Sequence, residues 1–357
     1  MFYMFLNDFI AFSNSWWPYI ISFCIVSIYA IRLYTGGVPY TNNKRIDGKT
    51  VIITGSTNGI GFETAKNICA RGGSVILAIR DMEKAKIAIQ RIKKDHEKAL
   101  VIAKLLDLTD FSSIQKFANE IALEYDKVDV LINNAAIIFQ PFQKTMKGNE
   151  MTIVTNFLGP FLLTHLLLSC LNKSEQGRII NVSAMAHFSG KLYLENLNME
   201  KHYNEMDAFA QSKLALTIFT KYLASLLIKT KITCNSVCPG MVRGTGYLNY
   251  SPLQKTIWSK LYWPWMWLFL KTPEEGCQSI VYLAVEPQLN DVSGYYFSEF
   301  DITEPSEQVK DVRLAEALYE RSCSIVDIKG REIIDSLEQA NDTETNDVSQ
   351  EHHNGDF

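Results

Sequence analysis

A glycine-rich stretch, TGSTNGIG over residues 54–61, is the part of the chain best suited to bind a phosphate-bearing ligand. Its glycines let the backbone turn sharply and approach a pyrophosphate, and a helix beginning there would add free N–H groups and the positive end of its dipole. An apolar run at 50–54 precedes the stretch and another follows about twenty residues later, the context expected of a dinucleotide-binding turn. The alternative is a structural turn without a ligand. The residues expected to bind the cofactor here are Gly55, Ser56, Thr57, Asn58, Gly59, Ile60 and Gly61.

The end of the second apolar run indicates which nicotinamide dinucleotide would bind. An acidic residue there would accept hydrogen bonds from a ribose 2′-hydroxyl, whereas the guanidinium of Arg80 suits a 2′-phosphate. We therefore expect NADP(H) rather than NAD(H). The alternative makes Arg80 a surface residue and Asp81 the N-cap of the helix predicted over 82–94, and the two roles are compatible.

Short apolar runs that alternate with longer helical patterns define the scaffold for these residues. Because the runs are apolar on both faces, they predict a parallel sheet covered by helices on each side. We expect a single α/β domain of the Rossmann type, a doubly wound parallel sheet, over residues 48–330. The strands are predicted at 50–54, 74–79, 99–104, 128–132, 178–182 and 232–237.

The N-terminal segment differs in kind from the rest of the chain. Residues 9–31 carry no charge, and a helix of this length, at about 1.5 Å per residue, spans a bilayer core. We predict a single membrane anchor over 1–34, followed by a Gly-, Pro- and Asn-containing linker over 35–47. A cleaved signal peptide or a buried core helix is the alternative. Asp8 before the apolar run disfavours a signal peptide, which would carry basic residues there.

Charge and cysteine content limit the function classes. Basic residues on the C-terminal flank of the apolar segment predict a domain that faces the cytosol: Arg32, Lys44 and Arg45. The net charge of −4 gives no overall basic field, so we expect no nucleic-acid binding. Seven scattered cysteines, without a His/Cys cluster, predict a reduced protein that has no metal site. The acidic stretch 338–357 is expected to be a disordered tail.

Further motifs follow the glycine-rich turn in a fixed order. They are NNAA (133–136), NFLGPFLLTH (156–165), NVSAMAH (181–187), SKLA (212–215) and CPG (238–240). With the GxxxGxG spacing of the turn, they resemble the short-chain dehydrogenase/reductase superfamily over residues 50–325. The stretches AIRDMEKA, AQSKLAL and LKTPEEG resemble its branch of retinol and polyprenol dehydrogenases. The resemblance implies NAD(P)-dependent interconversion of an alcohol and an aldehyde or ketone.

The resemblance also implies the remaining cofactor contacts. Asp107 and Leu108 would border the adenine, and Asn134 the adenosine ribose. The residues that would border the nicotinamide are Pro239, Gly240, Met241 and Val242. One departure from the family pattern is Gly244, which stands where a threonine is usual.

The catalytic positions depart further from that pattern. Hydride transfer requires a proton to move at the substrate oxygen, and the family assigns this task to a tyrosine with a lysine one helical turn later. Lys213 occupies the lysine position, but Phe209 occupies the tyrosine position. Ala184 replaces the serine that polarises the carbonyl, while Asn156, the fourth catalytic member, is retained. The cofactor half of the site is therefore expected to be intact and the proton-handling half to be missing.

Two hypotheses follow from this asymmetry. The loss of both hydroxyls favours a membrane-tethered NADP(H)-binding protein that is catalytically impaired or silent. The alternative is an active NADP(H)-dependent oxidoreductase in which water or another side chain replaces the tyrosine. The neighbours that could substitute are Ser183, His187, His202, Tyr203 and Ser212. Ser183 is expected to point away from the substrate because side chains alternate along a strand, and a serine beside the lysine is usual in the family.

The segment 257–271 is dense in Trp and Leu and predicts a roof over an apolar pocket or a contact with the bilayer. Aromatic core packing is the alternative. A roof of this kind would suit a lipid-like ligand, such as a retinoid, polyprenol or steroid. The family resemblance implies the endoplasmic reticulum first and the lipid-droplet surface second, and the sequence carries no signal for an oligomeric state.

Overall fold

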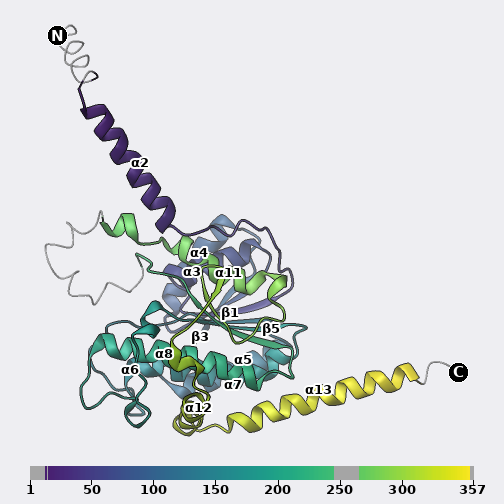
Figure 1. Ribbon diagram of the computed structural model, residues 1–357. Coiled ribbons are helices and arrows are strands. Elements are labelled where there is room, and N and C mark those ends of the chain that lie inside the picture. Colours follow the sequence, from purple (N-terminus) through teal and green to yellow (C-terminus); the bar gives the residue numbers. More distant parts are fainter. Residues whose placement is uncertain (1–12, 14, 245–264, 354–357) are drawn as a thin grey trace.

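The strands of the protein pair into one mixed sheet (Figure 1). A computed structural model describes residues 13, 15–244 and 265–353. The strands are β1 (Thr50–Thr54), β2 (Ser74–Ile79), β3 (Val101–Leu105), β4 (Val130–Asn133), β5 (Gly177–Val182), β6 (Ile232–Cys238), β7 (Tyr296–Ser298) and β8 (Asp301–Thr303). Within the described ranges they form an eight-stranded sheet in the order β3-β2-β1-β4-β5-β6-β7-β8, and β8 runs antiparallel to β7. The chain passes from β3 on one side of β1 to β4 on the other, which is the switch point of a doubly wound sheet.

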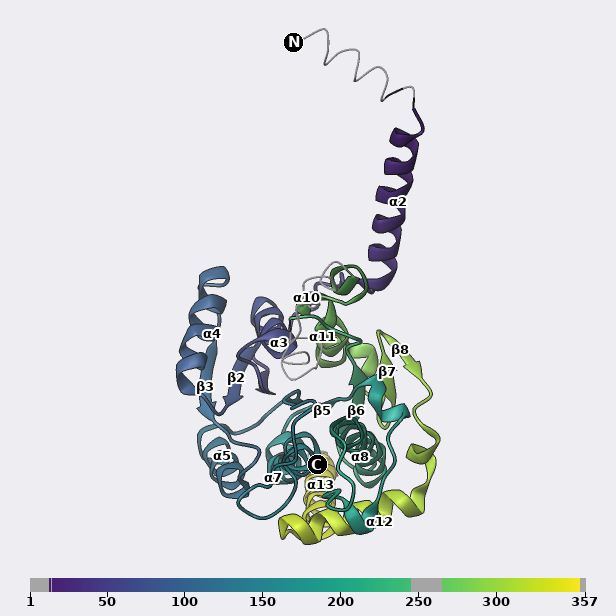
Figure 2. The ribbon, with the colours of Figure 1, turned by 90° about the vertical axis from the view of Figure 1, so that its left-hand side faces the viewer.

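Helices cover both faces of the sheet, as Figure 2 shows. One face carries α3 (Gly59–Ala70), α4 (Met82–Asp95) and α11 (Gln278–Val285). The other carries α5 (Phe111–Glu124), α7 (Gly159–Asn172), α8 (Glu205–Leu226) and α12 (Val312–Val326). Because side chains alternate along β1, Ile52 packs in the core on the α7 side, whereas Val51 and Ile53 pack in the core on the α3 side. The predicted doubly wound α/β fold is confirmed.

The six predicted strands are all present, each within two residues of its predicted limits. The sequence did not predict β7 and β8. These strands have only three residues each, too few to show a periodic pattern.

Short helical turns connect the longer elements. Residues Met151–Ile153 (α6) lead into a π-helical turn, η1 (Val154–Leu158), and then directly into α7. The remaining short elements are η2 (Met185–Phe188), η3 (Leu194–Asn196), α10 (Pro273–Gly276), η5 (Pro287–Leu289) and η6 (Glu307–Lys310).

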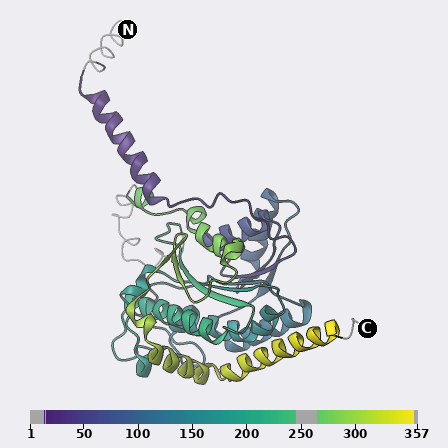
Figure 3. The same ribbon diagram turned by 45° about the vertical axis from the view of Figure 1, so that its right-hand side comes forward.

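The C-terminal part of the described chain is a long helix, α13 (Gly330–His353). Ile334 and Leu337 lie one turn apart and pack against the core on the α7 side, which fixes the start of the helix. The stretch 338–357, expected to be a disordered tail, is helical as far as His353, and Figures 1 and 3 show α13 extending away from the body of the domain. As far as His353, this stretch therefore continues a helix that starts against the core.

The helix α2 (Trp17–Thr35) stands apart from the domain (Figure 1). Its 19 residues are long and apolar enough to cross a membrane, and none of them is buried inside the protein. In the described chain the stretch Met151–Asn172 is also long and apolar enough to cross a membrane, but it is 89% buried and forms part of the core. Residues 1–12 of the predicted anchor and residues 257–264 of the aromatic segment lie outside the described residues.

Candidate functional site

A cavity of about 580 Å³ opens at the carboxyl ends of the parallel strands, beside the switch point between β1 and β4. The expected cofactor residues that line it are Gly55, Thr57, Asn58, Gly59, Ile60, Gly61, Arg80, Asp107, Leu108, Asn134, Lys213, Pro239, Gly240 and Val242. Ala184 and Phe209 line it as well. Three expected residues do not: Ser56, Asn156 and Met241. Residues from widely separated parts of the sequence thus meet at one site.

The glycine-rich turn is held in a conformation that leaves its backbone open to the cavity. Gly55 has φ 66°, and a Cβ at this position would lie 2.8 Å from Ala135 Cα, so a larger residue does not fit. Asn134 Nδ2 donates to the carbonyl oxygens of Thr54 and Gly55 at 2.9 and 3.2 Å. The side chain of Asn58, the N-cap of α3, makes no capping hydrogen bond. The first N–H groups of α3 are therefore available to a phosphate.

Two expected residues support this site from outside the cavity. Ser56 is fully buried and donates to Ile53 O at 3.1 Å, so its side chain stabilises the turn. Asn156 lies in the π-helical turn η1, a type of turn that often occurs at functional sites. Its side chain accepts from Ile137 N at 2.8 Å and donates to Ile137 O at 2.9 Å and to Ser212 Oγ at 3.0 Å. Asn156 therefore fixes the Ile137 backbone, and Ile137 lines the cavity.

Thr155 is a cavity residue that the sequence did not indicate. Its Oγ1 is buried and has no hydrogen-bond partner among the described residues. A buried hydroxyl is normally paired, so an orphaned one in a cavity wall suits a polar ligand. With the open glycine turn, this hydroxyl indicates that the cavity fits a dinucleotide. The turn and α3 would hold the pyrophosphate, and Asp107 and Asn134 lie toward the expected adenosine end.

The end of the cavity where the resemblance expects the adenosine carries charges of both signs, because Asp81 and Asp107 line it beside two basic residues. Arg80 and Lys84 both line it, and both side chains are exposed. Asp81 accepts from Glu83 N and Lys84 N, which confirms its predicted role as the N-cap of α4, and it also pairs with Lys84 Nζ at 3.2 Å. Lys84 was not predicted, although its place in the first turn after Arg80 was a usable signal. Two cations at this end could bind a 2′-phosphate.

Lys213 reaches the cavity from α8. Its Nζ donates to Val182 O at 2.7 Å, at the end of β5, and the residue is only 3% exposed. Burial lowers the pKa of Lys213 to about 8. An ammonium has three donors, so the group can also donate to a ligand hydroxyl.

The cavity wall in front of Lys213 is apolar. The Phe209 ring is 2% exposed, and its centroid lies 6.0 Å from Lys213 Nζ. Phe139 meets Phe209 edge to face, with ring centroids 6.0 Å apart. Phe139 has φ 53°, a left-handed conformation that is uncommon for a bulky residue. Ala184 contributes only a methyl group to the same cavity.

The polar neighbours of this wall are engaged elsewhere. Ser183 Oγ bonds Thr217 Oγ1 at 2.8 Å, and Ser212 Oγ donates to Phe209 O at 2.7 Å. His187 is buried, bonds Ala184 O and accepts from Ser306 N, and its burial lowers its pKa. Tyr203 Oη donates to Gln140 O at 2.7 Å, and burial raises the pKa of this tyrosine to about 12. His202 is exposed and does not line the cavity.

The fold and the cavity define a doubly wound α/β protein built to bind a dinucleotide at its switch point. The family described as short chain dehydrogenase matches residues 49–255, and the chain belongs to this family. Retinol dehydrogenase 13 from Mus musculus is 39% identical over 298 residues, which cover 83% of this chain and 89% of that protein.

Solved structures share the fold. A protein of Mycobacterium paratuberculosis has a TM-score of 0.66 and 28% identity, over 82% of this chain and 98% of that one. A short chain dehydrogenase of Shigella flexneri, complexed with NADP, has a TM-score of 0.57 and 21% identity, over 73% of this chain and 100% of that one. The second likeness, at this identity, shows the fold alone. Family membership and site geometry together support a nicotinamide dinucleotide as the cofactor.

Proposed function

We propose that the chain is a membrane-anchored protein that binds NADP(H) and is catalytically impaired or silent in hydride transfer. The observation that carries the proposal is the cavity wall in front of Lys213. Ala184 and Phe209 line it at the positions where the family resemblance expects a serine and a tyrosine. Without these hydroxyls, no donor of the expected kind faces a substrate oxygen.

The choice of NADP(H) is supported by the charge at the adenosine end. Arg80 and Lys84 could bind a 2′-phosphate, and β2 ends without the acidic side chain that would bind a 2′-hydroxyl. The Shigella flexneri protein of the same fold is complexed with NADP.

Anchoring by α2 is supported by its length, its apolar composition and its exposure. Beside it lie aromatic residues of the described part of the segment 257–271. Trp265 and Phe269 are 60% and 45% exposed, and their rings stack with centroids 6.1 Å apart. Trp favours the bilayer interface, so this surface suits a lipid-like ligand that enters from the membrane. The domain would face the cytosol, with the endoplasmic reticulum the expected membrane and the lipid droplet the next.

A second candidate function is an active NADP(H)-dependent oxidoreductase of a retinoid, polyprenol or steroid. It is favoured by the 39% identity with a protein named retinol dehydrogenase and by Lys213, whose pKa of about 8 would allow proton exchange near neutral pH. In this candidate, water or another side chain would take the place of the missing tyrosine hydroxyl.

The cofactor part of the proposal is tested by titrating the purified full-length protein with NADPH and NADH and following the quenching of protein fluorescence. NADPH should bind more tightly. The variant Arg80→Ala should lose roughly tenfold of that preference, the worth of one charge-assisted hydrogen bond. Lys93→Ala, which removes an exposed cation of α4 outside the cavity, is the control. Equal affinities for the two dinucleotides would contradict the choice of NADP(H), and failure to bind either would contradict both candidate functions.

A further inference from the structure

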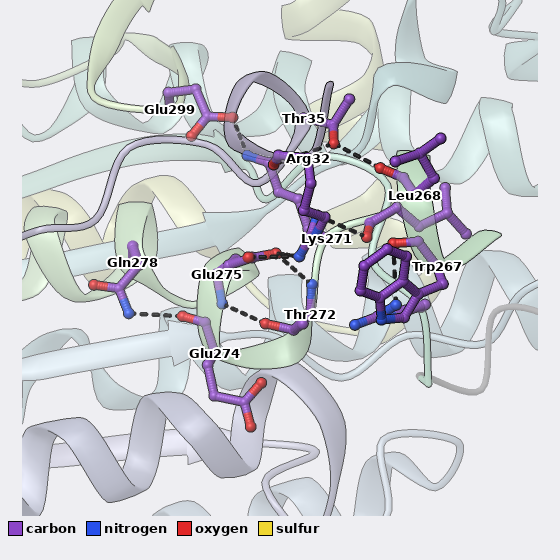
Figure 4. Close-up of polar contacts among 12 residues, drawn as sticks. Arg32, Thr35, Trp267, Leu268, Lys271, Thr272, Glu274, Glu275, Gln278 and Glu299 are labelled. Carbon is purple, nitrogen blue, oxygen red and sulfur yellow. Dashed lines mark hydrogen bonds and ion pairs between the residues drawn. The ribbon is translucent and has the colours of Figure 1, made fainter. Parts of the chain in front are cut away.

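The last turn of α2 is fixed to the segment that leads into α10, as Figure 4 shows. Arg32 Nη2 lies 2.5 Å from both carboxylate oxygens of Glu275, and Arg32 Nη1 donates to Leu270 O at 3.4 Å. Thr35 Oγ1 donates to Leu268 O at 2.8 Å. The side chain of Arg32 is 17% exposed and that of Glu275 is 32% exposed. Both carboxylate oxygens face the same guanidinium nitrogen, and this charge-assisted contact, partly removed from water, holds the last turn of α2 at Glu275.

Glu275 has a second role that makes this contact rigid. Thr272 N donates to Glu275 Oε2 at 2.7 Å, and Glu275 N donates to Thr272 Oγ1 at 3.2 Å. This reciprocal pair is a capping box, which defines the start of α10. The carboxylate that binds the anchor helix is therefore the one that fixes α10.

The same segment forms the outer support of the cavity wall at its expected nicotinamide end. Lys271 N donates to Met241 O and Arg243 N donates to Lys271 O, both at 2.9 Å, so Lys271 pairs with Val242 as in a parallel sheet. Behind Val242, a Cβ on Gly276 of α10 would lie 2.6 Å from Val242 Cγ2. Val242 lines the cavity. It is therefore held by Lys271 on its backbone and by α10 on its side chain.

The side chain of Lys271 links this segment to the turn between β7 and β8 and to Gly240. Its ammonium pairs with Glu299, which lies between β7 and β8 and has φ 57°. A Cβ on Gly240, another cavity residue, would lie 3.3 Å from Lys271 Cδ. We refer to Arg32, Thr35, Lys271, Glu275 and Glu299 as the anchor clamp. Lys271 is the clamp residue next to the cavity wall, because its backbone pairs with Val242 and its side-chain stem lies beside Gly240.

We propose that the anchor clamp positions the 239–243 loop. The base of helix α2 thereby stabilises the conformation of the loop that binds the dinucleotide. Arg32 and Glu275 are then positioning residues that act through Lys271 and α10 on Gly240 and Val242. Breaking their pair frees the loop, and dinucleotide affinity falls because the loop must be ordered again when the ligand binds. The inference goes beyond the proposed function, and only its affinity readout rests on that function.

The test uses the full chain in lipid nanodiscs and two variants that keep side-chain size, Arg32→Gln and Glu275→Gln. The second variant preserves the capping box, because a glutamine amide can replace that carboxylate. Two quantities are measured well below the melting temperature: backbone amide exchange over 240–243, since Pro239 has no N–H, and the dissociation constant for NADPH. The control is Arg45→Gln, which breaks an exposed linker ion pair with Asp47 and does not touch the cavity.

Both clamp variants should speed amide exchange in the loop, leave the end of β2 unchanged and weaken NADPH binding by at least about fivefold, the lower range of coupling between sites. Arg45→Gln should change neither the amide exchange of the loop nor the dissociation constant for NADPH. Unchanged loop exchange in Glu275→Gln would overturn the inference, as would faster exchange without weaker binding. A wild-type protein that does not bind NADPH would contradict the proposed function, while loop exchange would still decide whether the clamp positions the loop.

Discussion

Thr155 shows how a single side chain can report on a ligand. The residue lines the cavity and its buried hydroxyl is unpaired among the described residues, so we expect a bound dinucleotide to supply the missing partner. The isosteric variant Thr155→Val should weaken dinucleotide binding by roughly five- to tenfold, since a net hydrogen bond contributes about 1 kcal/mol. Ser112→Ala, at an exposed position of α5 outside the cavity, is the control for the titration. Unaltered affinity in Thr155→Val would mean that this hydroxyl does not face the ligand.

Lys213 should leave a signature in the pH dependence of stability. Burial lowers its pKa to about 8 in the folded protein from the ordinary lysine value of 10.5, so the unfolded chain binds more protons between these values. The contribution of Lys213 to the free energy of unfolding therefore rises with pH across that window. Below pH 8 the buried side chain is charged, and its burial destabilises the folded protein most. Wild type should gain up to about 3 kcal/mol relative to Lys213→Met between pH 7 and 10.5. The measurement is chemical denaturation without dinucleotide, and parallel curves for the two proteins would contradict a buried charged lysine.

The sequence predicted the residues that line the cavity better than the residues that support its wall. The sequence indicated the glycine turn, Arg80 and Lys213, and all of these line the cavity. It placed Asn156 among the catalytic residues, which stays a prediction, and the structure shows in addition that this buried side chain holds the backbone of Ile137. Neither the Asn156 contact nor the orphaned hydroxyl of Thr155 could be predicted, because both depend on the π-helical turn that rotates these side chains.

At the scale of elements, the N-terminus of α4 combines capping with charge. Asp81 caps the helix and pairs with Lys84, which lowers the positive potential at the expected 2′-phosphate site. Because Asn caps as well as Asp, Asp81→Asn should leave the melting temperature nearly unchanged and raise NADPH affinity several-fold at low salt. Titrations at two salt concentrations measure the effect. A gain that persists in high salt, or an equal gain for NADH, would contradict the electrostatic explanation.

Strands could be predicted from the sequence where their apolar runs were long enough to be recognised. Six parallel strands produced apolar runs that were read from the sequence, and all of them except the edge strand β3 are largely buried. By contrast, β7 and β8 are held by pairing with β6 and with each other. The contact between α2 and α10 joins residues 243 positions apart, and no local pattern indicates it. The helical continuation of α13 likewise depends on a start that Ile334 and Leu337 fix against the core.

At the scale of the whole molecule, the proposed membrane span of α2 implies that the domain lies on one side of the membrane. Possible glycan acceptors are NKS at Asn172, NYS at Asn249 and NDT at Asn341. The side chains of Asn172 and Asn341 bond each other at 2.8 Å. If the domain faces the cytosol, none of the three sites is glycosylated. Protein made with microsomes should show no shift on endoglycosidase treatment, while a glycosylation site in an N-terminal extension should be modified. A shift in the natural sequence would place the domain in the lumen.

The central claim is that the molecule keeps a complete cofactor cavity beside an apolar wall where the proton-handling hydroxyls should be. The most direct test compares NADPH-dependent reduction of retinal, a polyprenal and a steroid ketone by wild type and by the double variant Ala184→Ser/Phe209→Tyr. We predict equal NADPH affinity and a kcat/KM at least about 100-fold higher in the double variant, since a general acid alone contributes about that much and the two effects need not multiply. Wild-type turnover equal to that of the double variant would contradict the claim.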